Sequence, residues 1–181
     1  MKKIAIIVGS LRKGSFTKQI ANYMKNMFPE GFNTEFIDIA ELPMYNQDFD
    51  LPGNTPQNYV DFRKEIASAD GFIFATPEYN RSYPAVIKNA LDIASRPYGQ
   101  NLWKEKPAIL ISVSPGAIGA FGASAHLRHV LSFLDVQLMQ SPELYIGNVQ
   151  KLIEKDGSLN ESTSTFLQSS VENLLICLSK L

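Results

Sequence analysis

The sequence predicts an α/β domain in which helices cover both faces of a parallel sheet. Several short runs are apolar throughout, segments with helical spacing lie between them, and strand and helix alternate five times. Because crossovers between parallel strands are right-handed, this alternation gives a doubly wound fold. The 181 residues lie near the usual size of one domain, so we expect a single domain over 1–181.

Five segments are predicted to be strands. Ile4 to Val8 is an unbroken apolar run that meets Gly9, as is typical of a strand buried on both faces of a parallel sheet. Three similar runs and a weaker fifth complete the set: Glu35 to Ile39, Gly71 to Thr76, Ala108 to Val113 and Val136 to Met139.

Five further segments are predicted to be helices. Phe16 to Phe28 places apolar residues about one turn apart, and Ser15 can cap its first turn. Pro56 to Ala69 has proline at its first position after a Thr55 cap. The remaining helices are Pro84 to Ser95, Ser124 to Leu134 and Thr163 to Lys180. We expect an ordered surface loop over 42–55 and a turn within 151–162.

Charge and cysteine content restrict the class of partner. With 17 Lys and Arg against 18 Asp and Glu, no strong field attracts nucleic acid or an anionic membrane, so small-molecule partners are expected. The single cysteine, Cys177, excludes an intrachain disulfide and suits a reducing compartment. No run approaches the roughly 20 apolar residues of a membrane-spanning helix. We therefore expect a soluble, cytoplasmic protein.

Function is expected in loops that follow strands, because ligands of open parallel sheets bind beyond the carboxyl ends of the strands. Three such loops have unusual sequences: loop 1 (Gly9 to Thr17), loop 2 (Thr76 to Tyr83) and loop 3 (Ser114 to Gly122). All three are predicted to lie at the same edge of the sheet.

Loop 1 has the composition of a phosphate-binding turn. It leads directly from a strand into a helix, whose unpaired amides and dipole favour an anion. Ser10, Ser15 and Thr17 add hydroxyl donors, and Arg12 adds a charge-assisted bond. A serine-rich helix cap without a ligand is the alternative interpretation.

Two nucleotide-binding motifs do not fit loop 1. The P-loop requires Lys and then Ser or Thr directly after its second glycine, whereas Ser15 and Phe16 follow Gly14. The dinucleotide pattern G-x-G-x-x-G fails because position 11 is Leu11. A site for a phosphate monoester remains compatible with the sequence.

Loops 2 and 3 have features that suit a planar heterocycle such as a flavin. In loop 2, Tyr79 and Tyr83 offer flat surfaces, while Asn80 and Ser82 offer hydrogen bonds. Loop 3 has three glycines at intervals of three, which allow the backbone to approach a ligand closely. An aromatic turn packed on the core and a flexible connection are the respective alternatives.

These loops resemble those of the NADPH-dependent FMN reductases, a flavodoxin-like family that includes quinone, azo-dye and chromate reductases. The resemblance covers nearly the whole chain and is most specific in GSLRKGSFT (9–17), PEYN (77–80), S-x-P (82–84) and HLR (126–128). It implies a flavodoxin-like, five-stranded parallel sheet of order 2-1-3-4-5.

The resemblance also implies roles for individual residues. The FMN phosphate is expected on Ser10, Arg12, Ser15, Phe16 and Thr17, although many relatives have asparagine at the position of Thr17. The isoalloxazine ring is expected against Pro77, Glu78, Tyr79 and Asn80, with Ser114 and Gly116 contributing from loop 3. We predict that Arg81 and Tyr83 contact the substrate, with a solvated surface arginine as the alternative for Arg81.

The implied activity is hydride transfer from NADPH or NADH through bound FMN to quinones, azo or nitro compounds or chromate, by a ping-pong mechanism. No catalytic side chain is assigned, because FMN carries the chemistry. His126 and His129 lie three apart on one helix without nearby carboxylates or cysteines, so no metal is expected. A flavodoxin-like electron carrier and a non-catalytic flavin-binding protein are the alternatives. The resemblance further implies a homodimer or homotetramer.

Overall fold

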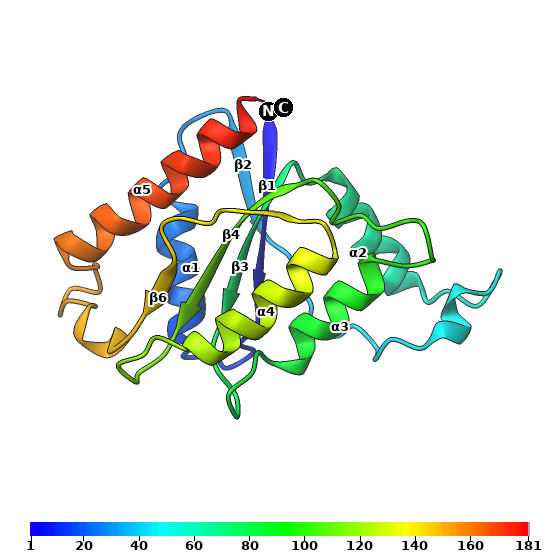
Figure 1. The fold of residues 1–181 in the computed structure, drawn as a ribbon, viewed down its shortest axis with the longest axis horizontal. Coiled ribbons are helices and arrows are strands. Elements are labelled where there is room, and N and C mark those ends of the chain that lie inside the picture. Colours follow the sequence, from blue (N-terminus) through cyan, green and yellow to red (C-terminus); the bar gives the residue numbers. More distant parts are fainter. Residues whose placement is uncertain (181) are drawn as a thin grey trace.

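A computed structural model of the chain describes residues 1–180 and has a parallel sheet at its centre (Figure 1). The strands β1 (Lys2–Val8), β2 (Phe32–Phe36), β3 (Gly71–Thr76) and β4 (Pro107–Val113) lie in the order β2-β1-β3-β4. Two short strands, β5 (Gln137–Leu138) and β6 (Leu144–Ile146), both pair with β4. The predicted order 2-1-3-4-5 is therefore confirmed, with a sixth strand added.

Helices cover both faces of the sheet, as the doubly wound prediction requires (Figure 1). On one face lie α1 (Phe16–Lys25) and α5 (Glu161–Leu178), and on the other lie α2 (Gln57–Ser68), α3 (Ala85–Ala94) and α4 (Phe121–Phe133). Side chains of each central strand alternate between two cores: Phe72 and Phe74 of β3 face α2 and α3, whereas Ile73 faces α1 and α5. This alternation explains why the central strands are apolar at every position.

The second strand lies earlier in the chain than predicted. Glu35 to Ile39 was the expected strand, but β2 begins at Phe32, directly after Gly31, and ends at Phe36. All five residues of β2 are only partly buried, because the strand forms an edge of the sheet. The apolar run that suggested a later strand includes Ile37 and Ile39, which lie beyond the strand and pack into the core.

The sixth strand was missed by the sequence analysis. β5 pairs with Pro107 and Ala108 of β4, and β6 pairs further along the same strand, at Ile111 to Val113. The two strands have only two and three residues, which is too short for a periodic pattern. The fifth position of the sheet is thus shared, and β6 is the part that reaches the edge where the loops lie.

Helix ends differ by a few residues from the prediction. Ser15 caps α1 as expected, because its hydroxyl accepts the Lys18 N–H at 3.1 Å. Pro56 is the N-cap of α2 rather than its first residue, so Thr55 is not the cap. α4 begins at Phe121, three residues before the predicted Ser124. Its N-cap, Ala120, has a left-handed conformation and no side chain able to cap, which removed the usual start signal.

The surface loop over 42–55 is ordered, as predicted, and contains a 3₁₀ turn at Gln47–Asp50. Asp50 is nearly buried and forms ion pairs with Arg63 at 3.1 Å and with Arg96 at 2.9 Å. Burial by itself would raise the pKa of Asp50, but hydrogen bonds from Tyr45, Arg96 and Arg63 hold it below its ordinary value. The loop is thereby fixed to α2 and to the end of α3.

The connection that precedes α5 turns as predicted, through a 3₁₀ turn at Val149–Lys151 and a bridge between Ile153 and Leu159. Within residues 1–180, no helix is both long and apolar enough to cross a membrane.

Candidate functional site

The three loops leave the carboxyl ends of β1, β3 and β4 and lie together at one edge of the sheet, at the bottom of Figure 1. Loop 1 meets loop 2 at Gly9, where an added Cβ would lie 3.3 Å from Pro77 Cδ and 2.5 Å from Ile87 Cδ1. Loop 2 meets the start of α4 at Gly122, where an added Cβ would lie 3.0 Å from the Arg81 carbonyl oxygen. These two glycines allow the loops to pack against each other.

The backbone of loop 1 is open to a ligand. Within residues 1–180, the amides of residues 10–14, 16 and 17 have no hydrogen-bond partner, whereas the Ser15 amide donates to the Arg12 carbonyl at 3.1 Å. The amides of Phe16 and Thr17 belong to the first turn of α1, where the helix dipole adds partial positive charge. The loop therefore presents a set of donors that an anion can accept.

The hydroxyls of loop 1 add to these donors. Ser10, Ser15 and Thr17 are all buried, and no described residue accepts a hydrogen bond from their hydroxyls. The guanidinium of Arg12 lies 5.7 Å from the centre of the Phe16 ring, so the cation bends back over the start of α1. The structure thus brings together the five residues predicted to hold a phosphate.

Loop 2 forms a tight hairpin turn. Tyr79 and Ser82 exchange backbone hydrogen bonds of 2.8 and 3.0 Å, and the two residues between them, Asn80 and Arg81, both have positive φ, at 49° and 67°. This is the pattern of a type I′ turn, in which a non-glycine residue such as Arg81 is strained. Among residues 1–180, the amides of Glu78, Asn80 and Arg81 have no partner. Strain of this kind is typical of binding sites.

Glu78 connects loop 2 to α4. Its Oε2 accepts the Ala123 N–H at 3.1 Å, and its Oε1 accepts a bond from Arg81 Nη1 at 3.2 Å. Because Ala120 has no capping side chain, Glu78 caps α4 from another loop. The sequence analysis assigned Glu78 to the flavin edge and missed this cap, for which the chain carries no local signal.

Loop 3 is held by β6 and is not a flexible connection. The Ser114 amide donates to the Ile146 carbonyl at 2.9 Å, and the Asn148 amide donates to the Gly116 carbonyl at 3.1 Å. The buried Ser112 hydroxyl donates to the Gly119 carbonyl at 2.6 Å. Gly119 allows this packing, because an added Cβ there would lie 2.6 Å from the Tyr145 carbonyl carbon.

Each of the three loops leaves a large apolar side chain exposed at this edge. Leu11, Tyr79 and Ile118 are exposed by 53%, 52% and 57%, and Phe121 at the start of α4 by 53%. Clustered exposed apolar groups of this size indicate a binding surface. Together with the anion-binding donors of loop 1, they fit a molecule with a phosphate at one end and a flat ring at the other, as in FMN.

The two residues predicted to contact substrate lie in different environments. Arg81 is 76% exposed beside Glu78 and therefore free to meet a ligand from solvent. Tyr83 is partly buried against the core, which raises the pKa of its hydroxyl, and it lines a hollow of about 340 Å³ between loop 2 and α4. His126 and His129 line the same hollow. Within residues 1–180, no group of His, Cys, Asp and Glu is arranged to hold a metal ion.

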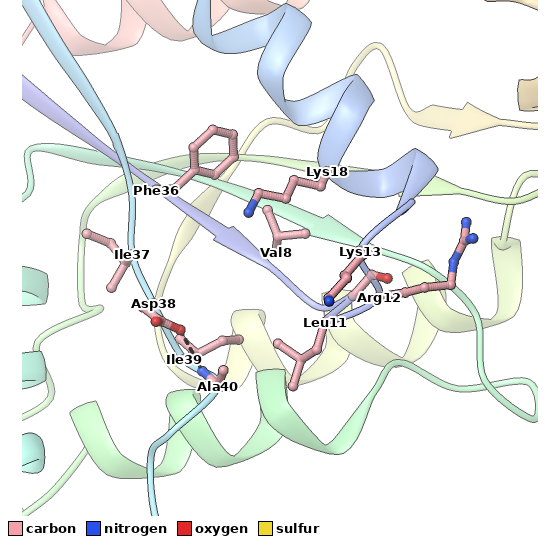
Figure 2. A pocket seen from close by; sticks show the side chains of 11 residues that line it. Val8, Leu11, Arg12, Lys13, Lys18, Phe36, Ile37, Asp38, Ile39 and Ala40 are labelled. Carbon is pink, nitrogen blue, oxygen red and sulfur yellow. Dashed lines mark hydrogen bonds between the residues drawn. The ribbon is translucent and has the colours of Figure 1, made fainter.

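A cavity of about 370 Å³ lies on the other side of loop 1, facing the chain that follows β2 (Figure 2). Ser10 and Arg12 are its only lining residues among those predicted to bind the phosphate. Lys13, Lys18 and Asp38 also line it, and the sequence analysis did not single them out. In the sequence, the position of Asp38 directly after an apolar run could have indicated this cavity.

Comparisons with known proteins identify the family of the chain. A family model described as NADPH-dependent FMN reductase matches residues 2–151. A quinone reductase from Pseudomonas putida KT2440 is 45% identical over 93% of this chain and 90% of its own length. A 2-hydroxy-1,4-benzoquinone reductase from a Burkholderia species is 46% identical over 94% and 92%. The solved structure of FerB, a flavoenzyme NAD(P)H:(acceptor) oxidoreductase from Paracoccus denitrificans, is 39% identical with a TM-score of 0.91, covering 99% of this chain and 98% of FerB.

Proposed function

The chain belongs to the family of NADPH-dependent FMN reductases, and we propose that it transfers two electrons from NAD(P)H through bound FMN to a quinone. Loop 1 carries this proposal, because its free amides, buried hydroxyls and Arg12 form an anion site next to the exposed apolar groups of loops 2 and 3. A quinone is the acceptor we favour, since two relatives above 40% identity are named quinone reductases.

Each of the three loops would bind a different part of FMN. Loop 1 holds the phosphate through Ser10, Arg12, Ser15, Phe16 and Thr17. Pro77, Glu78, Tyr79 and Asn80 line one side of the ring, and Ser114 and Gly116 line its far edge. The chemistry that FMN supplies when bound is reversible two-electron transfer. The free amides of loop 2 are placed to stabilise negative charge that develops on a ring held there.

We propose that donor and acceptor use this one site in turn, which is a ping-pong mechanism. NAD(P)H loses a hydride and leaves as NAD(P)⁺; the quinone then gains two electrons and two protons and leaves as the hydroquinone. Arg81 and Tyr83 are the side chains we place beside these substrates. Azo compounds, nitro compounds and chromate are further acceptors that the same open edge could admit.

The proposal is tested by the visible spectrum of the purified protein. We expect a yellow protein whose absorbance near the flavin band disappears when NADPH is added without oxygen and returns when a quinone is added. A protein that remains colourless after incubation with FMN would overturn the proposal. A protein that binds FMN but does not oxidise NADPH or NADH would be an electron carrier or a non-catalytic flavin-binding protein.

The mechanism and the assembly need separate measurements. Initial rates over a grid of NADPH and quinone concentrations should give parallel double-reciprocal lines, whereas intersecting lines would exclude ping-pong kinetics.

We propose a homodimer or homotetramer, which light scattering of the eluted protein would distinguish from a monomer.

A further inference from the structure

The cavity between loop 1 and the chain after β2 shares loop 1, including Ser10 and Arg12, with the site formed by the three loops but opens toward β2. Leu11, Lys13 and Lys18 line it on one side, and residues 36–40 line it on the other (Figure 2). No residue of loops 2 or 3 lines it. Its volume of about 370 Å³ is in the range of small-molecule sites.

The charge around this cavity is positive and unneutralised. Arg12, Lys13 and Lys18 line it, and none of them forms an ion pair with any carboxylate of residues 1–180. The single acid, Asp38, uses its Oδ1 to accept the Ala40 N–H at 2.9 Å. In Figure 2 the Arg12 side chain points away from residues 37–40, whereas the Lys13 and Lys18 ammonium groups lie nearer to them. The two lysines are therefore the cations available to an anion in this cavity.

The walls of the cavity are apolar. Phe36, Ile37 and Ile39 come from the chain after β2, and the 53% exposed Leu11 comes from loop 1 (Figure 2). The Lys18 ammonium lies 5.8 Å from the centre of the Phe36 ring, and neither it nor the Lys13 ammonium is paired with a carboxylate of residues 1–180. An apolar wall beside these two cations suits a ligand that joins a flat, uncharged ring to a phosphate. A nucleotide has this combination, with its base for the wall and its phosphate for the lysines.

The position of the cavity relates it to the redox site. β1 lies between β2 and β3 in the sheet, and Phe36 at the end of β2 is level with Ile73 of β3. Two strand spacings and three residues of rise therefore separate the end of β2 from the start of loop 2, a distance of roughly 14 Å. A pyridine dinucleotide is long enough to place its nicotinamide at loop 2 and its adenosine at β2. Asp38 lies after the strand next to β1, where an acid accepts the free 2′-hydroxyl of NAD in dinucleotide-binding sheets, so its charge opposes a 2′-phosphate and is outnumbered by those of Lys13 and Lys18.

From these observations we propose that the cavity binds the adenosine 2′-phosphate end of NADPH, with Lys13 and Lys18 on the 2′-phosphate. This inference rests on the proposed function and adds to it a basis for choosing between NADPH and NADH. NADH lacks the 2′-phosphate, so the lysines distinguish the two donors by charge.

The kinetic test uses the FMN-loaded protein and the double variant Lys13→Ala/Lys18→Ala. Loss of two charge-assisted contacts should raise KM for NADPH about tenfold or more, with kcat and KM for NADH changed by less than about twofold. Lys64→Ala is the control, since it removes an exposed cation of α2 that does not line the cavity and should leave both KM values unchanged. An equal rise in KM for NADH and NADPH would overturn the assignment to the 2′-phosphate, as would no change.

A binding test separates this site from the FMN site. Adenosine 2′,5′-bisphosphate should bind the FMN-loaded protein in calorimetry, compete with NADPH, and bind about tenfold more weakly to the double variant. The affinity of the apoprotein for FMN should be the same in the variant and the wild type. If the variant loses FMN instead, the lysines belong to the FMN phosphate site and the proposal fails. FMN binding and NADH oxidation are measured on the same samples. Wild-type protein that does neither would overturn the proposed function, whereas protein that does both but whose double variant still binds the bisphosphate normally would overturn only this inference.

Discussion

Loop 1 and loop 3 both connect a buried strand to a helix at the same edge of the sheet, yet their backbones are satisfied differently. In loop 1 most amides have no partner within residues 1–180, and the helix is capped by the loop's own Ser15. In loop 3 the backbone bonds to Ile146 of β6 and to Asn148 just after it, and the helix is capped by Glu78 of loop 2. Loop 1 thus keeps free backbone donors, whereas loop 3 is fixed by hydrogen bonds to a neighbouring segment.

The largest expected effect is on stability, from a substitution in loop 3. Gly119→Ala should lower the free energy of unfolding by roughly 3 kcal/mol, because it adds left-handed strain at φ 60° and a contact with the backbone at Tyr145. In the matched substitution in loop 1, Gly14→Ala, the added methyl group meets only the flexible Arg12 side chain. The free energy of unfolding should therefore change by less than about 0.5 kcal/mol. Urea unfolding of both variants measures this contrast, and equal effects would show that loop 3 is not the more tightly packed loop.

The next effect is on the anion site. Arg12→Ala should weaken FMN binding by roughly 10- to 100-fold, because it removes a charge-assisted bond to the phosphate. Arg12 is exposed, so the melting temperature of the apoprotein should not change. Fluorescence titration with FMN provides the measurement, and Lys13→Ala, one residue further along, is the control that should bind FMN normally. Normal binding by the Arg12 variant would remove this residue from the phosphate site.

A smaller effect is expected where loop 2 meets α4. Glu78→Ala should lower the free energy of unfolding by about 1 kcal/mol, the usual effect of losing a helix cap, and should speed hydrogen exchange at the Ala123 amide. Glu78→Gln keeps an acceptor oxygen and should therefore lose much less stability than Glu78→Ala. The ion pair with Arg81 contributes little because Arg81 is exposed. An unchanged exchange rate in the alanine variant would contradict the capping role.

The smallest effect is expected at the tip of loop 2. Arg81→Ala should raise KM for NADPH by roughly two- to fivefold, the range of an exposed charge, while Arg81→Lys should stay close to the wild type. Alanine has the same left-handed strain as arginine at this position, so the stability of the fold should be unaffected. Steady-state kinetics with unchanged KM in the alanine variant would identify Arg81 as a solvated surface residue.

The parts of the site that could be predicted are those with local signals. Ser15 was identified as a cap because a hydroxyl preceding an amphipathic run satisfies a free amide, which depends on neighbouring residues only. The cap of α4 could not be predicted, since Glu78 lies 45 positions from Ala123. β6 could not be predicted for the same reason, because its three residues form a strand only by pairing with β4, which is distant in the sequence.

The sequence alone determined where β1, β3 and β4 lie along the chain, the helices between them and the loop that presents free amides, because apolar runs and helix starts are encoded residue by residue. The order of the strands in the sheet was expected only from the resemblance to a known family. Tertiary structure decided where β2 begins, that Ile37 and Ile39 are core residues outside a strand, and that Gly119 of loop 3 packs against β6. It also brought Lys13, Lys18 and Asp38 around one cavity. Each of these depends on contacts between distant segments, and such contacts have no periodic trace in the chain.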